Sequence, residues 1–220
     1  MAHSPPRTGA DIAAEDHAAS SAIRRYEERL AKDPDSLVFA TLADAYRKAG
    51  RTQEAIRLCR EGLDRFPEYT TARLALARAL ADDGDVEAAL GELRMILDRN
   101  PADVPARRLA GHLEWNRGGF EAAATHLRQA VSLDPSDRES RVLLDVLEAG
   151  GQPAGGSALG RLLADDTFAT MSFATICLEQ GLVDEAAQIF LRLLRRDAGH
   201  ADARRKLDDA LRIKIQKRKG

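Results

Sequence analysis

Apolar residues recur at three- and four-residue spacing along most of the chain, which places them on one face of an α-helix. The clearest example is residues 36–67, where two apolar stripes flank a turn at Ala49-Gly50-Arg51. The first stripe comprises Phe39, Leu42, Ala43 and Tyr46, and the second comprises Ala55, Ile56, Cys59 and Leu63. Neither helix can bury its stripe alone, so we expect the two helices to pack on each other and then on a neighbouring pair.

The helix pair repeats with a fixed period of 34 residues. The markers of this period are the glycines Gly50, Gly84 and Gly118, the alanines Ala55, Ala89 and Ala123, and the prolines Pro67, Pro101 and Pro135. Glycine suits the left-handed residue that ends a helix, alanine lets two helices cross closely, and proline ends the second helix. Three concordant markers therefore predict a tandem array of helix–turn–helix units.

Residues 36–67 resemble a tetratricopeptide repeat in residue size as well as in spacing. Phe39 stands at the tryptophan position of that pattern, Leu42-Ala43 at the leucine–glycine pair and Tyr46 at the tyrosine, and Ala55, Cys59 and Pro67 stand at the alanine, phenylalanine and proline positions. The resemblance implies an all-α fold, a right-handed α-solenoid of stacked antiparallel helix pairs.

The markers also predict how the chain is divided. We expect a mostly disordered tail over 1–19, a helix of an incomplete repeat over 20–35, full repeats over 36–69, 70–103 and 104–137, a degenerate repeat over 138–166, a last repeat over 167–200, and a capping helix with a basic tail over 201–220. Gly118 and Gly181 are 63 residues apart where two periods give 68, so one unit is shortened. A Gly/Pro-rich linker at 150–157 marks the interruption, which is either a soft joint or a change in how the last repeat docks.

Composition fits this fold and limits the function classes. Hydrophobic residues make up 44%, charged residues 31% and aromatic residues 5%, which suits helices with thin Ala/Leu seams. The net charge of −2 gives no bulk electrostatic case for nucleic acid or membrane binding. No stretch reaches the roughly 18 apolar residues of a membrane span, and the first residues lack a secretory signal pattern, so we expect a cytoplasmic protein. Cys59 and Cys177 are interpreted as reduced core residues.

The sequence carries no catalytic signature, so we expect no enzyme, no small-molecule substrate, no metal and no cofactor. A P-loop, GxSxG, HExxH and paired CxxC are all absent. His112-Leu113-Glu114 has the start of a deaminase signature without the PCxxC that holds zinc. The acidic run at 82–85 falls on a repeat turn and matches no EF-hand length, which favours a solvated turn.

The resemblance implies that a partner protein or peptide binds in a concave groove lined by the first helix of each repeat. The implied groove residues are Arg47, Lys48, Leu74, Arg78, Arg108, His112, Trp115, Asn116, Val142 and Val146. The arginines favour an acidic or mixed acidic–apolar ligand, with Trp115 as an aromatic surface. In the alternative interpretation the arginines pair with Asp44, Asp82 and Glu114, and Trp115 packs against a neighbouring repeat.

Three further features leave alternatives open. Arginine occupies the fourth position of three units, at Arg73, Arg107 and Arg141, where packing of the methylenes with an inter-repeat ion pair is favoured over ligand contact. The basic tail, with Lys214, Lys217, Arg218 and Lys219, is either a solvated helix end or a site for nucleic acid or an anionic surface. Packing of solenoid ends between copies would instead make a homo-oligomeric, self-assembling scaffold.

Overall fold

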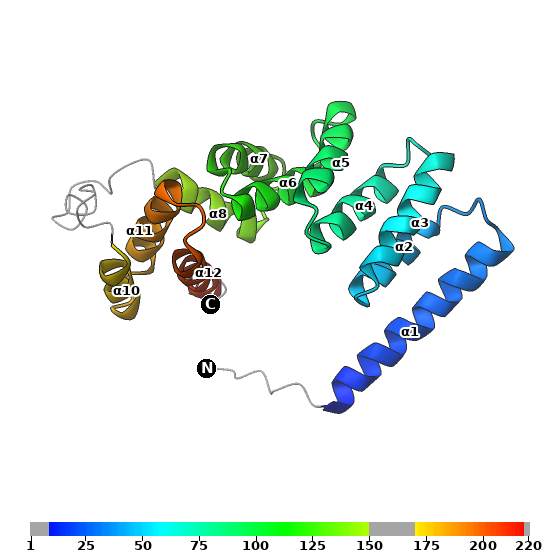
Figure 1. The fold of residues 1–220 in the computed structure, drawn as a ribbon, viewed down its shortest axis with the longest axis horizontal. Helices are drawn as coiled ribbons and strands as arrows, with labels where there is room; N and C mark the ends of the chain where they lie inside the picture. The colour runs from blue at the N-terminus through cyan, green and yellow to red at the C-terminus, as the bar shows by residue number, and fades with distance from the viewer. Residues whose placement is uncertain (1–8, 150–169, 218–220) are drawn as a thin grey trace. The chain divides into compact units, whose positions relative to one another are not determined.

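The computed structural model describes residues 9–149 and 170–217, and every regular element in those ranges is an α-helix (Figure 1). The chain divides into two compact units, residues 1–101 (unit 1) and 102–220 (unit 2). Unit 1 contains α1 (Gly9–Lys32), α2 (Phe39–Lys48), α3 (Thr52–Arg65), α4 (Thr70–Asp82) and α5 (Val86–Arg99). Unit 2 contains α6 (Val104–Arg117), α7 (Phe120–Leu133), α8 (Arg138–Ala149), α10 (Met171–Glu179), α11 (Val183–Arg196) and α12 (Ala201–Lys217). The predicted all-α fold is confirmed.

Helix α1 begins at Gly9, so the helix predicted from about Ser20 extends further toward the N-terminus. Residues 10–19 are rich in alanine, the strongest helix former, so the helix continues in the direction of the N-terminus. It ends at Lys32, directly before Asp33-Pro34. Residues 1–8, the predicted linker at 150–157 with residues 158–169, and residues 218–220 of the predicted basic tail lie outside the described residues.

The marker residues of the period occupy the positions that their chemistry predicts. The turn glycines Gly50, Gly84, Gly118 and Gly181 all have φ between +74° and +89°, the left-handed region in which a Cβ is strained. The marker alanines Ala55, Ala89, Ala123 and Ala186 are completely buried. The proline of each full repeat follows the second helix by two residues, as at Pro67 after α3. Helix boundaries are therefore set by glycine and proline, and helix contacts by alanine.

Phe39 is the centre of the unit 1 core. Its side chain has no exposed surface, and its ring stacks on Phe66 at 6.2 Å and meets Tyr69 edge-on at 5.7 Å between ring centroids. A Cβ added to Gly62 on α3 would lie 2.1 Å from the Phe39 ring. The aromatic residue on α2 is thus accommodated by the missing side chain on α3.

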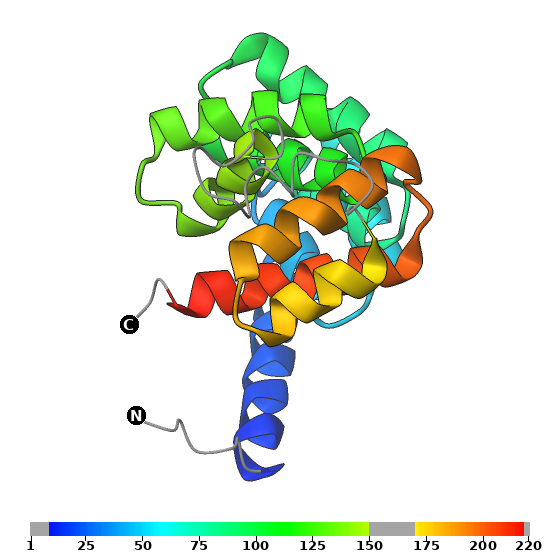
Figure 2. The same ribbon diagram turned by 90° about the vertical axis from the view of Figure 1, so that its left-hand side faces the viewer.

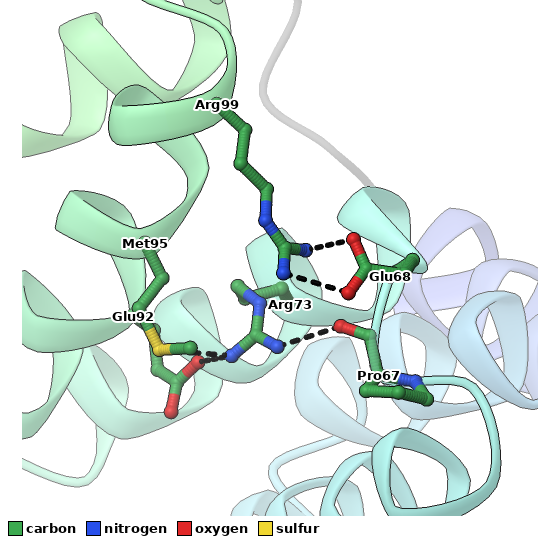
Figure 3. A network of polar contacts seen from close by, with 6 residues as sticks. All are labelled: Pro67, Glu68, Arg73, Glu92, Met95 and Arg99. Carbon is green, nitrogen blue, oxygen red and sulfur yellow. Dashed lines mark hydrogen bonds and ion pairs between the residues drawn. The ribbon is translucent and has the colours of Figure 1, made fainter.

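Arg73 joins α4 to α5 and to the end of the preceding repeat (Figure 3). Its guanidinium is nearly buried, lies 2.6 Å from Glu92 and donates to the carbonyl oxygen of Pro67 at 2.7 Å. The structural interpretation of this fourth-position arginine is confirmed, except that its ion pair lies within one repeat and the link between repeats is the hydrogen bond to Pro67. Arg107 approaches His126 Nδ1 at 3.5 Å in the equivalent place, whereas Arg141 is exposed.

A second arginine, in the last turn of the second helix, ties successive repeats of unit 1 together. Arg65 donates to the carbonyl oxygen of Pro34 at 2.5 Å and lies 3.3 Å from Asp35. Arg99, which is 34 residues later, makes a two-pronged ion pair with Glu68 (Figure 3). Both arginines reach back to the loop that precedes their own repeat.

In unit 2 the helices of the last repeat and α12 pack together with the earlier helices of the unit. One hydrophobic core contains residues of α6, α7, α8, α10, α11 and α12. Figure 2 shows α10, α11 and α12 side by side, and α12 also contacts α8. Arg195 on α11 donates to the carbonyl oxygen of Leu147 near the end of α8 at 3.5 Å. The described residues thus show contacts of α11 and α12 with α8, whereas the predicted linker at 150–157 lies outside them, so both interpretations of the shortened unit stay predictions.

Candidate functional site

The predicted groove residues of unit 1 line one face formed by α2 and α4, here called the α2–α4 face. Arg47 is held by two carboxylates, with Nε 3.1 Å from Asp44 and Nη1 2.7 Å from Asp82. Lys48 lies 2.7 Å from the second oxygen of Asp44. Although burial opposes it, hydrogen bonds from Lys48 and Arg47 hold the pKa of Asp44 below its usual value. Much of the predicted cationic charge is therefore neutralised within the face.

Arg78 is the exception on this face. Asp82 stands one helical turn after Arg78, where it could form an i,i+4 ion pair, but its carboxylate is bonded to Arg47. Within residues 9–149 and 170–217, Arg78 has no hydrogen bond or ion pair, and its side chain is half-buried beside the half-buried Leu74 on the same helix. The α2–α4 face thus combines one unneutralised guanidinium with an apolar surface.

The predicted groove residues of unit 2 have different environments. Arg108 is exposed and lies 3.5 Å from Asp137, and Asn116 is exposed. Although burial opposes it, hydrogen bonds from Ser140 and the charge of Arg108 hold the pKa of Asp137 below its usual value. The predicted pairing of an arginine with Glu114 is found with a different arginine, since Arg117 Nε lies 2.6 Å from that carboxylate.

Trp115, Val142 and Val146 do not form an exposed groove lining. Each of these side chains has at most 2% of its surface exposed and belongs to the unit 2 core. The Trp115 ring meets Phe120 edge-on at 5.6 Å between centroids, and Arg204 of α12 donates to the Trp115 carbonyl oxygen at 2.9 Å. Trp115 is therefore packed in the unit 2 core, as the alternative interpretation expects, but the ring contacts that the structure shows are with Phe120 of its own repeat and with Arg204 of α12.

His112 is half-buried and has one ring nitrogen, the buried Nε2, without a hydrogen-bond partner among the described residues. Burial lowers the pKa of this imidazole, Arg108 lowers it further, and Glu139 and Asp137 oppose the shift. Burial therefore disfavours the protonated form of His112 in the folded protein.

We expect His112 to make the wild-type protein sensitive to mild acid. Because its folded-state pKa lies below the unfolded value of 6.5, its contribution to stability is complete above that pH and is lost as the pH falls through this range. Urea unfolding would be followed by Trp115 fluorescence at pH 7.5 and at pH 5.5. The decrease in urea midpoint between these two pH values should be smaller in His112→Gln than in wild type. An equal loss of stability in wild type and variant would contradict this assignment.

The acidic turn at 82–85 is structural. Asp82 binds Arg47, Asp83 accepts a hydrogen bond from Gln53 Nε2 at 2.6 Å, and Asp85 caps α5 by accepting from Ala88 N at 3.1 Å. Each carboxylate thus has a protein partner, as expected for a solvated turn. In the parts of the chain that the structure describes, no group of His, Cys, Asp and Glu is arranged to hold a metal ion, and no helix is long and apolar enough to span a membrane.

Sequence reasoning missed the α12 residues that meet α6 and α8. Asp208, Leu211, Arg212 and Ile215 line a cavity of about 220 Å³ together with His112, Trp115, Asn116, Glu139 and Leu143. The pattern of α12 predicted a capping helix with Leu207, Leu211 and Ile213 on one side, and Leu207 and Leu211 are indeed buried. Nothing in the local pattern gives the contact between Arg204 and a residue 89 positions earlier.

Comparison with known proteins identifies the repeat. Residues 46–113 match the family model described as "Tetratricopeptide repeat". Among solved structures, a thermophilic TPR protein from Thermus thermophilus is 21% identical, with a TM-score of 0.55 over 88% of this chain and 90% of the other. A tetratricopeptide repeat protein from Parabacteroides merdae is 16% identical, with a TM-score of 0.53 over 90% and 67%.

A third solved structure, YrrB, is described as a TPR protein with an unusual peptide-binding site. It is 15% identical, with a TM-score of 0.52 over 86% of this chain and 83% of the other. No curated protein matches the chain. At these identities the structural matches support the fold alone.

Proposed function

Residues 46–113 are tetratricopeptide repeats, and from this premise we propose that the protein is a non-catalytic scaffold that binds a partner protein segment on the α2–α4 face. Repeats of this family suggest a role in protein–protein interaction, because stacked helix pairs create extended binding surfaces. The segment that fits the α2–α4 face is acidic or mixed acidic and apolar. A cytoplasmic location stays a prediction.

The observation that carries the proposal is the state of Arg78. Arg78 is half-buried and has no ion pair among the described residues, so its guanidinium can donate two hydrogen bonds to a ligand carboxylate without first breaking an ion pair. Leu74, one turn before it, offers an apolar contact beside that charge. Arg47 and Lys48 are already neutralised, so they contribute less to binding than Arg78.

Arg78→Glu should weaken capture of the native partner by roughly 10- to 100-fold, since a hydrogen bond to a charged group contributes about 1.5–3 kcal/mol. Arg94→Glu is the matched control, because Arg94 is an exposed arginine on α5 and receives the same charge change. Proteins captured from the native cell by wild type and both variants would be compared by quantitative mass spectrometry.

The proposal requires a set of proteins that wild type and Arg94→Glu retain and Arg78→Glu loses, with unchanged helicity. If Arg78→Glu captures the same proteins in the same amounts, the α2–α4 face is not the binding site.

The two alternative functions have less support. In the basic tail, Lys214 is largely buried and lies 2.7 Å from Asp184 at the start of α11, so this cation already has a structural partner. Self-assembly through solenoid ends stays a prediction that light scattering at high concentration tests directly.

A further inference from the structure

The inference concerns the surface of α6 and α8 beside α12, here called the α6–α8 face. Helix α12 packs mainly on α11, and it also contacts α8 and the carbonyl oxygen of Trp115 on α6. The 34-residue period relates Trp115 and Asn116 on α6 to Arg47 and Lys48 on α2. In unit 1 the equivalent positions are accessible, whereas in unit 2 Trp115 is buried beside α12. A helix of the same chain therefore occupies the surface that the repeat pattern assigns to a ligand.

Arg204 anchors α12 through both charge and shape. Its guanidinium donates to the Trp115 carbonyl oxygen at 2.9 Å, in the last turn of α6, where the helix dipole favours a cation. The same guanidinium carbon lies 5.9 Å from the ring centroids of both Trp115 and Phe120. The neighbouring Arg205 makes only an exposed ion pair with Asp202 on its own helix.

The remaining contacts between α12 and this face are imperfect. Leu211 and Ile215 of α12 line a partly open pocket of about 220 Å³ together with His112 and Leu143, so α12 does not cover this face completely. His112 Nε2 is buried there without a partner among the described residues. Burial also raises the pKa of Asp208 and lowers the pKa of Arg204, so the environment disfavours the charged form of both groups. The polar contacts of α12 with this face are therefore less favourable than its apolar packing in the unit 2 core.

We propose that the α6–α8 face is a helix-binding surface that α12 occupies in the free protein and that an amphipathic partner helix can take over. The partner helix carries the pattern of α12, an arginine followed by apolar residues seven and eleven positions later, as in Arg204, Leu211 and Ile215. Displacement of α12 uncovers Trp115 and frees the basic helix. This site is in unit 2 and is independent of the proposed binding at Arg78.

The test uses a labelled peptide of residues 201–217 as the probe and the full-length protein as the receptor. The apparent affinity for an occupied surface is reduced by the fraction of molecules in which that surface is open. Arg204→Ala removes one hydrogen bond of the resident helix, so it should tighten peptide binding, measured by fluorescence anisotropy, by roughly 2- to 12-fold. Arg205→Ala, its matched control, should bind the peptide as wild type does. A peptide with Arg204→Ala should bind more weakly than the unaltered peptide.

A stronger variant supplies a second readout. Leu211→Asp places a carboxylate on the buried side of α12 and should release the helix. Because Trp115 is the only tryptophan, its emission should shift to the red and its quenching by acrylamide should increase, and the unaltered peptide should reverse both changes.

The outcomes decide the proposal as follows. Equal peptide affinity of wild type, Arg204→Ala and Arg205→Ala would overturn it, as would Leu211→Asp protein that keeps its helicity and binds no peptide. If Leu211→Asp does not fold, the comparison of the two arginine variants decides.

Discussion

Phe39→Ala should destabilise the protein by about 3–5 kcal/mol, the range for removing a buried aromatic ring from a packed core. The ring is fully buried between Phe66 and Tyr69, and Gly62 on α3 leaves the space that it fills. The vacated volume cannot collapse, because the backbone of two helices defines it. Urea unfolding followed by far-ultraviolet circular dichroism should show a large decrease in the urea midpoint.

Leu37→Ala is the control for this experiment. Leu37 lies two residues before Phe39 and is 46% exposed, so its truncation should change stability by no more than about 0.5 kcal/mol. If Phe39→Ala lost less stability than Leu37→Ala, Phe39 would not be the centre of the unit 1 core.

The second large effect is expected at Arg73. In the wild type, the nearly buried Arg73 side chain lies 2.6 Å from Glu92 and donates a hydrogen bond to the carbonyl oxygen of Pro67 (Figure 3). Arg73→Glu places an anion beside Glu92 and removes this hydrogen bond. Breaking a buried pair costs about 3–5 kcal/mol, and we expect the lower value because the Glu92 side chain keeps 23% of its surface exposed. Thermal unfolding followed by circular dichroism would measure the loss.

Arg141→Glu is a matched control for Arg73→Glu. Arg141 occupies the same position of the repeat, 68 residues later, but its side chain is exposed, so the same substitution should change stability by no more than about 0.5 kcal/mol. Restoring opposite charges with Arg73→Glu combined with Glu92→Arg should recover part of the loss, because groups in contact are energetically coupled. Similar losses at both arginines would show that burial does not determine the effect.

The elements of the fold could be predicted from the sequence because their signals are local. Gly50 and Pro67 act on the backbone within a few residues, and Ala55 reports a contact between helices that are joined by one short turn. The N-terminal extent of α1 is harder to predict, because alanine-rich residues without an apolar stripe carry little periodic signal. The docking of α12 depends on a contact between Arg204 and Trp115, for which no local pattern exists.

The candidate site was predictable only as a set of positions. Arg47 and Arg78 occupy equivalent helix faces, yet one is neutralised by Asp44 and Asp82 and the other has no such partner among the described residues. The difference depends on which arginine Asp82 contacts, a matter of side-chain geometry. For Trp115, the 34-residue period predicts the helix face on which it lies. The period cannot show that α12 lies beside that face.

The separation of Arg204 from Trp115 also has a consequence for biosynthesis. The two residues are 89 positions apart, and ribosomes add roughly 5–20 residues per second, so α12 is made roughly 4–18 s after α6. Unit 1 can complete its core from neighbouring repeats while the chain is still growing. Unit 2 has to wait, and until α12 is synthesised the nascent chain exposes the apolar surface around Trp115 to any chaperone that recognises it.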